Sequence, residues 1–476
     1  MFVATPPHRE SLNTLGLMVD PAKRTPGKTP WPEWWLGVLV LGLIAAWSIM
    51  FWQTFTHPFV WDDLHLIRQY SLSELLSAWH GSIDPDGIET PALRPLATLL
   101  LHVQGTLFGE NMVLQRAFMM ALMGSLLWII GILLRDVGLS FLHVAVVLVL
   151  FTFSRIFASL ALWIILGSLI FAYILMILAA LFYLRWVGRG SPSLLALTLL
   201  FAALATMVRE EAYTLPLALP LIWWLSSPDR KDYRRPLLGA LGVLVVVVLH
   251  YALGRIFIVG APQPGVHPWL WRAIATAWFP GGAFSTGWVD RLMTFGWLTF
   301  VLFLAALAAR CGSPKRQELI LGIGALSLVL SAPALGAPRA FGTALPSLAS
   351  FTAVSILIVD VLLGSLSVPH KRWRPILISI CVAGLALGVA AGVRRSIYVA
   401  QSLDPNAVGI VIRDFDFLHN RRAIIPEARR QEKMAHLSAL GIQSEDDVAK
   451  LMRARYDALV VVKPPMFVEK YDYLFF

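Results

Sequence analysis

Two adjacent carboxylates, Asp62 and Asp63, follow Trp61 shortly after the first long apolar run of the chain. An ionised carboxylate at a membrane boundary is unfavourable unless water, a cation or a substrate meets it. A carboxylate held there can act as a general base that takes a proton from a hydroxyl group. The structural alternative is that Asp63 only N-caps a short helix through Leu64–Tyr70. Neighbouring side chains on a regular backbone cannot point the same way, so we expect one Asp to cap or position and the other to face a reaction.

Further charged side chains gather at the ends of apolar runs that we assign to the same side of a membrane. They are His65, Arg94, Arg155, Arg209, Glu210, Glu211, Arg255 and Arg339. A guanidinium can hold a phosphate through two parallel hydrogen bonds, which makes these residues candidates for binding a lipid-linked sugar phosphate. The alternative is that Arg94, Arg209 and Arg339 form structural pairs with the acidic residues.

The composition predicts an all-α polytopic membrane protein. Of 476 residues, 57% are hydrophobic and 14% are charged, which is typical of a chain with many membrane spans. The formal net charge is +10. Because the Lys and Arg residues lie mainly between apolar runs and in the tail, they indicate membrane orientation and no nucleic-acid partner.

A membrane span needs about 20 apolar residues. On this criterion we expect eleven spans, at 34–56, 112–134, 139–154, 166–185, 192–208, 212–226, 236–258, 291–310, 317–336, 344–363 and 375–393. An odd number of spans puts the two ends of the chain on opposite sides. Membrane lipids are therefore expected to surround most of the chain.

The distribution of Lys and Arg sets the expected orientation. One set of connections is cation-rich, with Lys23, Arg24, Lys28, Arg135, Arg185, Arg189, Arg230, Lys231, Arg234, Arg235, Arg310, Lys315, Arg316, Lys371, Arg372 and Arg374. Cation-rich connections face the cytoplasm. We therefore predict a cytoplasmic N-terminal segment at 1–33, a transmembrane domain at 34–393 and an extracytoplasmic tail at 394–476, in a bacterial inner membrane.

The outward segments carry local signals of their own. In the outer loop 57–111, residues 71–79 and 94–108 have apolar side chains at helical spacing, and Ser71 with Glu74 forms a capping-box pattern. We expect both to be amphipathic helices in the membrane interface. A short helix is expected through Pro268–Ala277. The tail changes to a charged composition, and we expect a small α/β appendage with helices at 426–440 and 444–456 that packs on the outer face.

Four motifs resemble the GT-C superfamily of polytopic glycosyltransferases, and within it protein O-mannosyltransferase-like enzymes and their bacterial relatives. The motifs are Phe59-Val60-Trp61-Asp62-Asp63; Arg94-Pro95-Leu96, followed by Leu107-Phe108-Gly109-Glu110-Asn111; Val208-Arg209-Glu210-Glu211-Ala212, followed by Leu215-Pro216; and Pro338-Arg339-Ala340-Phe341, followed by Leu345-Pro346. The resemblance lies in their order, spacing and shared outward placement across residues 60–350.

The resemblance implies a transferase that uses a polyprenyl-phosphate-linked sugar donor and a protein, glycan or lipid acceptor. An acidic residue of the first outer loop would deprotonate the acceptor hydroxyl; we assign this role to Asp62, with Asp63 capping or positioning. Arg209 and Arg339 would bind the lipid phosphate and stabilise the leaving group. Glu210 would orient Arg209 or contact the sugar.

One departure from the family concerns a divalent cation. Some members have a further acidic residue in the second outer loop, whereas here Ser154 to Ser168 contains no carboxylate. A metal site built that way is in doubt, and Arg155 can supply positive charge in its place. Two other functions stay open: a flippase or transporter for a lipid-linked anion, which more often shows inverted repeats, and a non-catalytic membrane assembly protein.

Overall fold

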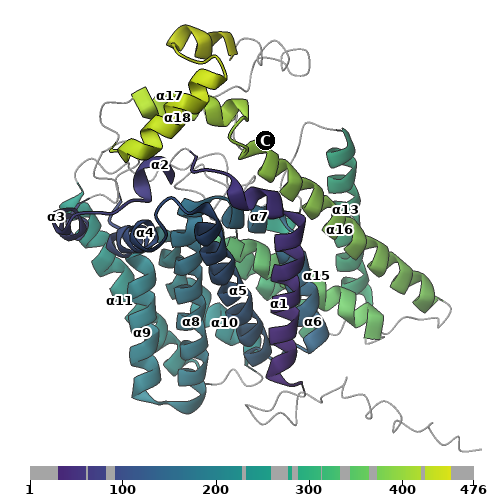
Figure 1. Ribbon diagram of the computed structural model, residues 1–476. Coiled ribbons are helices and arrows are strands. Elements are labelled where there is room, and N and C mark those ends of the chain that lie inside the picture. The colour runs from purple at the N-terminus through teal and green to yellow at the C-terminus, as the bar shows by residue number, and fades with distance from the viewer. Residues whose placement is uncertain are drawn as a thin grey trace, which may run out of the picture.

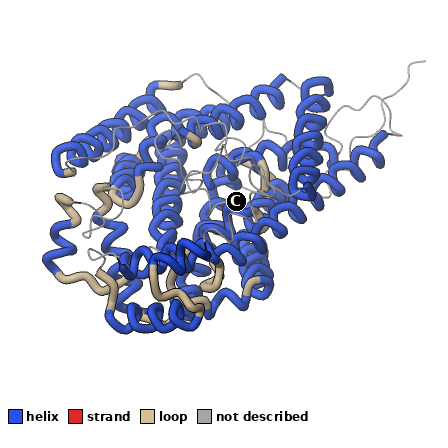
Figure 2. Tube along the Cα trace, turned by 90° about the horizontal axis from the view of Figure 1, so that it is seen from above, coloured by secondary structure: helices blue, strands red, loops and turns tan. Residues whose placement is uncertain are grey.

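The computed structural model describes residues 31–60, 63–81, 92–227, 232–258, 277–280, 288–311, 314–332, 344–363, 373–419 and 424–451. These residues form helices joined by loops and contain no strand (Figure 2). The helices stand side by side in a bundle, with shorter elements gathered at one end (Figure 1). The expected all-α fold is thereby confirmed for the part of the chain that the structure describes.

The helices of the bundle and its edges run, in chain order, as follows: α1 Glu33–Met50, η3 Trp52–Thr56, α2 Asp63–Leu66, α3 Leu72–Ser77, α4 Pro95–Phe108, α5 Met112–Asp136, α6 Phe141–Thr152, α7 Arg155–Leu162, η4 Ile164–Leu166, α8 Gly167–Arg189, α9 Pro192–Thr206, η5 Glu210–Thr214, α10 Leu215–Ser226, α11 Arg234–Phe257, α13 Trp288–Cys311, α14 Pro314–Leu330, α15 Ala344–Leu363, α16 Arg374–Ser402, α17 Val408–His419 and α18 Glu427–Ala439.

Each of the eleven predicted spans overlaps one of these helices, although α1 ends at Met50 and α14 at Leu330, before the predicted ends at 56 and 336. Seven described helices are long and apolar enough to cross a membrane, and an eighth crossing results if the bent pair α6–α7 counts as one span. Helices α9 and α10, with 15 and 12 residues, are shorter than a membrane span. The multi-pass architecture is therefore present by length and composition, and the number of eleven crossings stays a prediction.

Two helices form the centre of the bundle. In their most apolar windows, the α8 span is 83% buried and α15 is 89% buried, whereas α1 is only 22% buried. The exposed side chains of α1 and α11 are largely Leu, Val, Ile and Trp. Apolar side chains on the outside of a bundle are the composition that a lipid environment favours.

The chain turns sharply between α6 and α7. The two helices meet at 61°, and Ser154 caps the start of α7 by accepting a hydrogen bond from the Phe157 amide at 3.2 Å. The spans expected at 139–154 and 166–185 leave residues 155–165 as a connection between them, whereas residues 155–162 of this connection form a helix in a new direction. A capping serine lets the backbone restart a helix after a break without leaving amides unpaired.

Helix α16 crosses this break at close range. A Cβ added at Gly392 would overlap the carbonyl oxygen of Phe153, and the Ser396 hydroxyl donates to the Ser154 carbonyl at 3.2 Å. The helix continues past residue 394, where the tail was expected to begin, and ends at Ser402.

Gly392→Ala is accordingly expected to destabilise the protein by about 1–3 kcal/mol, because α16 must move away from the break to accommodate the methyl group. Thermal unfolding of the purified protein in detergent measures the effect. Gly42→Ala is the control, since a Cβ at exposed Gly42 has no atom within 4 Å. Equal melting temperatures for both variants would contradict the close crossing.

Cationic helix ends gather at the end of the bundle where α1 begins. Arg135 at the end of α5 pairs with Glu33 at 2.7 Å, and Arg185 near the end of α8 pairs with Asp136 at 3.0 Å. Helices α2, α3 and α4 lie at the opposite end (Figure 1). Arg135 and Arg185 of the cation-rich set thus lie at the other end of the bundle from α2, α3 and α4; which end is cytoplasmic stays a prediction.

Both helices expected in the first outer loop are present as α3 and α4. Ser71 and Glu74 form the predicted capping box in both directions. Helix α4 begins at Pro95 and packs against the loop so closely that a Cβ at Gly105 would lie 2.6 Å from the Arg68 carbonyl oxygen. The helix expected at Pro268–Ala277 lies almost entirely outside the described residues.

The tail packs above α2 at the same end of the bundle (Figure 1). Helices α17 and α18 share a small apolar core that includes Phe415 and Leu437, and Lys433 pairs with Asp414 at 2.7 Å with both side chains buried. The expected helix at 426–440 is confirmed. The helix expected at 444–456 is described up to residue 451. The described part of the tail contains no strand, so the expected α/β character is not found there, and residues 408–412 belong to α17.

Candidate functional site

Asp63 lies at the start of the four-residue helix α2 and is 1% exposed. Its Oδ1 accepts a hydrogen bond from the backbone amide of Ile165 at 2.9 Å. The expected capping role in a helix through Leu64–Tyr70 is wrong, because α2 ends at Leu66 and the carboxylate reaches a distant turn instead. Its second oxygen, Oδ2, has no hydrogen-bond donor among the described residues. Asp62 lies outside the described residues.

Burial dominates the electrostatics of Asp63. Removal from water raises the pKa of its carboxyl to about 7, against the lowering effects of Arg116, the Ile165 amide and Arg429. Arg116 comes from the second turn of α5, is 3% exposed and donates a hydrogen bond to the Leu162 carbonyl. A carboxyl with such a pKa changes its charge near neutral pH, as a general base must.

A second charged group forms where α4 begins. The Arg94 guanidinium grips Glu210 as a fork, with Nε donating to both carboxylate oxygens at 3.0 Å and Nη2 donating to Oε2 at 2.6 Å. Burial alone would lower the pKa of Arg94, but Glu210 outweighs it and raises that pKa. Burial would likewise raise the pKa of Glu210, but Arg94 lowers it. This pair therefore stays ionised at neutral pH.

Arg209 lies in the same group as Arg94 but is held less tightly. Its Nε lies 3.5 Å from Glu211 Oε2, and neither atom makes a hydrogen bond within the described part of the chain. Burial and the nearby Arg94 charge both lower the pKa of Arg209. Two neighbouring guanidiniums, one of them loosely paired, are an arrangement that an added anion would stabilise.

Aromatic side chains connect this group to the surface. The Tyr213 hydroxyl lies 2.8 Å from His250 Nδ1, and the Tyr213 ring meets the Tyr251 ring with centroids 6.3 Å apart. Exposed Arg255 donates to the Tyr251 hydroxyl at 3.0 Å. The predicted site residue Arg255 therefore stands at the rim, connected to the Arg94 group through Tyr251 and Tyr213.

The remaining predicted residues fall in different surroundings. His65 is buried in α2, 1% exposed. Arg155 begins α7, where its backbone amide donates to the Pro280 carbonyl at 2.8 Å. Burial and the positive charge of Arg395 in α16 both lower the pKa of its guanidinium. Arg339 lies outside the described residues, so its predicted place beside Arg209 is neither shown nor contradicted.

Helix α4 separates the Asp63 group from the Arg94 group. Leu96 near the start of the helix donates to the Met207 carbonyl at 3.3 Å, whereas Gln104 near its end lies against Gly167, close to the turn that binds Asp63. The eight residue steps from Leu96 to Gln104 span about 12 Å of helix. The charged side chains that lower the pKa of Asp63 are Arg116 and Arg429. The described residues therefore do not show Asp63 and Arg209 in one cluster of charged side chains.

Arg116, Glu110 and Arg429 are members of the site that the sequence analysis did not select. Arg116 sits inside the predicted span 112–134, and a cation within an apolar run is a signal of function that was available. Arg429 gave no such signal, because it lies in a polar helix among other charged residues. Within the described ranges, no group of three or more His, Cys, Asp or Glu side chains is placed to hold a metal ion.

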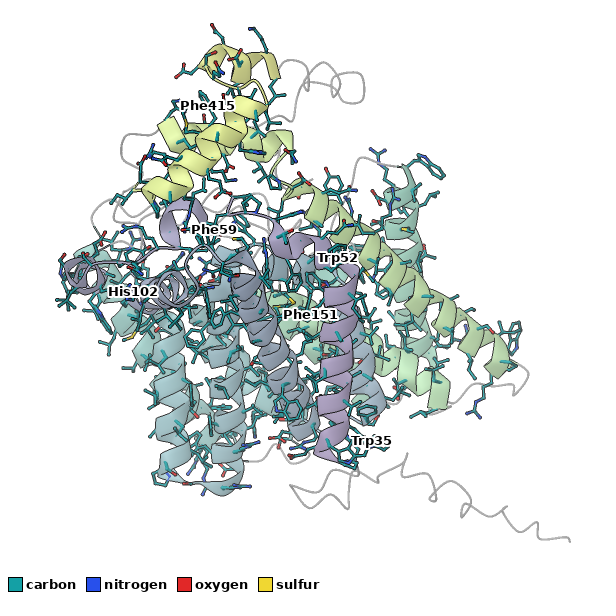
Figure 3. All side chains as sticks on the ribbon, in the orientation of Figure 1. Trp35, Trp52, Phe59, His102, Phe151 and Phe415 are labelled. Atoms are coloured by element: carbon teal, nitrogen blue, oxygen red, sulfur yellow. The ribbon has the colours of Figure 1, made fainter. Side chains whose placement is uncertain are left out.

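By length and composition of its helices, the chain is a multi-pass helical membrane protein, and Phe59 and His102 lie at the end of its bundle that faces the tail (Figure 3). No protein-family model matches the chain, and no curated protein sequence matches it. The function must therefore be inferred from the geometry of these side chains.

Proposed function

We propose that the protein is a membrane glycosyltransferase of GT-C type, which moves a sugar from a polyprenyl-phosphate donor to an acceptor hydroxyl on the extracytoplasmic side. In this proposal the chain crosses the membrane eleven times, with the N-terminal segment in the cytoplasm and the tail outside. The observation that carries the proposal is the buried carboxyl of Asp63, with a pKa near neutral and an oxygen that no described donor satisfies, at the same end of the bundle as the Arg94 and Arg209 guanidiniums.

The chemistry follows from these groups. One carboxylate of the Asp62–Asp63 pair takes the proton of the acceptor hydroxyl while the acceptor oxygen forms a bond to the anomeric carbon of the sugar. The bond between that carbon and the phosphate oxygen breaks, and the polyprenyl phosphate leaves with the bonding electrons. Arg209, with Arg94 and Arg339, balances the charge that develops on the phosphate.

The direct test uses membranes that contain the full-length chain, incubated with a radiolabelled polyprenyl-phosphate sugar and extracted for product. Wild-type membranes are expected to transfer label to an endogenous acceptor, and membranes with the double variant Asp62→Asn/Asp63→Asn are expected to transfer none above background. Immunoblotting verifies equal amounts of protein. Full transfer by the double variant would refute the assignment of the base.

A flippase for a lipid-linked anion is the alternative that the same experiment separates. Movement of the labelled lipid across sealed vesicles without covalent transfer would favour a flippase. An assembly protein without catalytic function predicts neither transfer nor movement. Mass spectrometry of the lipid and the product, in cells with and without the gene, identifies the sugar and shows whether the acceptor is a protein, a glycan or another lipid.

A further inference from the structure

Arg429 of α18 connects the tail to the segment that contains Asp63. Its side chain is 3% exposed although α18 is a polar helix in a charged tail. One terminal nitrogen, Nη1, donates to three backbone carbonyls, those of Asp63 at 3.0 Å, Leu64 at 2.8 Å and Ile67 at 3.0 Å. Residues more than 360 positions apart in sequence are thereby joined.

These carbonyls need an external donor. A helix leaves its last four carbonyls without partners inside the helix, and α2 has only four residues. Arg429 therefore acts as a C-terminal cap supplied by another element. A cation is well placed there, because the C-terminal end of a helix carries partial negative charge.

The guanidinium is fixed on its other sides as well. Its Nε donates to Glu110 Oε2 at 3.0 Å and its Nη2 donates to Glu110 Oε1 at 2.6 Å. The guanidinium carbon also lies 4.0 Å from the centre of the Phe59 ring. In Figure 3, Phe59 lies between the bundle and the tail that carries Phe415. A lysine could not satisfy carbonyls, carboxylate and ring together, since only a guanidinium offers five donors in one plane.

We propose that Arg429 is a positioning residue: it fixes the backbone of residues 63–67, so that the tail is a working part of the site. We call the hydrogen bonds from Arg429 to the carbonyls of residues 63–67 and to Glu110 the clamp. Its effect on catalysis rests on the proposed function, whereas its effect on the backbone of residues 63–67 does not. Arg429 affects Asp63 in two ways. It donates a hydrogen bond to the backbone carbonyl of Asp63, and its positive charge lowers the pKa of the Asp63 carboxyl.

The clamp is tested by hydrogen–deuterium exchange of the purified full-length chain. Arg429→Gln is expected to speed exchange of the backbone amides of residues 63–70 by about tenfold, because it leaves buried carbonyls unpaired and lets the segment open. Glu110→Gln removes one partner of the clamp and keeps the carbonyl bonds, so a smaller increase is expected. Unchanged exchange of residues 63–70 in Arg429→Gln would overturn the inference.

Arg430→Gln is the matched control. Arg430 is the next residue of α18, and its Nη1 donates to the Leu418 carbonyl inside the tail. Its loss is expected to leave exchange of residues 63–70 unchanged. Exchange across α17 reports whether the tail remains folded in every variant. Faster exchange of α17 in Arg429→Gln would mean a loss of tail structure; in that case Glu110→Gln decides, and unchanged exchange of residues 63–70 in that variant overturns the clamp.

Transfer kinetics separate positioning from mere stability. With Arg429→Lys, kcat is expected to fall about tenfold with KM for the donor nearly unchanged, because the chemical step and not donor binding needs the fixed segment. Both Arg116 and Arg429 lower the pKa of Asp63. Loss of the Arg429 charge in Arg429→Gln should therefore raise that pKa and move the acid limb of the pH–rate profile to higher pH. A fall in active protein alone would also lower the apparent kcat and leave KM unchanged, but it would not move the acid limb of the pH–rate profile, so the position of that limb separates positioning from stability. Absence of transfer by the wild type would defeat the proposed function and leave the exchange result to decide the clamp.

Discussion

Asp63→Asn is expected to reduce sugar transfer by about 10²–10⁴-fold, the usual contribution of a positioned carboxylate to proton abstraction. Asparagine keeps the shape of the side chain and can still accept a hydrogen bond from the Ile165 amide, so the loss would come from the missing charge. The measurement is the initial rate of transfer in membranes with matched amounts of protein. A rate within a factor of about three of the wild type would remove Asp63 from the reaction and leave Asp62 as the remaining candidate base.

The same residue predicts opposite pH trends for rate and for stability. With a pKa of about 7, the carboxyl is mostly protonated at pH 6, so transfer should fall to about a tenth of its plateau there. The pKa of this carboxyl in the folded protein lies above its ordinary value of 3.8, so the stability that the protonated group provides is lost as pH rises from about 4 to about 7. The wild type should therefore lose more stability over this range than Asp63→Asn does. The measurement is the melting temperature of both proteins at pH 5 and at pH 8. An equal change in melting temperature between these pH values in the two proteins would contradict the raised pKa of Asp63.

Arg94→Gln is expected to lower transfer by about 10²-fold, if the guanidinium stabilises charge on the departing phosphate. It should also lower the free energy of unfolding by about 1–2 kcal/mol. This loss is smaller than for a fully buried ion pair, because the Arg94 and Glu210 side chains are both partly exposed. Glu210→Gln should destabilise it to a similar extent. The double variant Arg94→Gln/Glu210→Gln leaves no unpaired charge, so it should recover stability without recovering transfer.

Recovery of both stability and transfer in the double variant would show that the Arg94–Glu210 fork is only structural. The matched control is the pair Arg135–Glu33 at the opposite end of the bundle, with a distance of 2.7 Å. Arg135→Gln/Glu33→Gln is expected to leave transfer within about twofold of the wild type, because this pair lies at the other end of the bundle from the proposed site and its carboxylate is largely exposed. Thermal unfolding and transfer are measured on the same membranes.

The elements of the fold followed from local pattern, because a span or a cap depends only on residues close together in sequence. Apolar runs gave the positions of the helices that the structure describes, and Ser71 with Glu74 gave the capping box of α3. The turn of the chain between α6 and α7 was not predicted. No proline or glycine marks it; Ser154 and the close passage of Gly392 stabilise it from outside.

The candidate site was predicted residue by residue but not as an arrangement. Arg94 and Glu210 were both selected, yet their direct pairing depends on α4 starting beside the end of α9. Arg209 was expected to bind the lipid phosphate, and its described partner is Glu211, one of the acidic residues with which the alternative paired it. Arg429 was missed, because nothing in a sequence indicates that a cation in a polar helix will be buried against carbonyls 366 positions away.

By itself, the sequence determined that this protein is helical and multi-pass and which charged residues lie at the ends of its helices. The reason is that hydropathy, capping and charge placement act over one or two helical turns. Only the tertiary structure decided which of those charges meet. Burial of Asp63, the Arg94–Glu210 fork and the grip of Arg429 all arise when helices distant in sequence come together and exclude water, and that exclusion sets the pKa of Asp63.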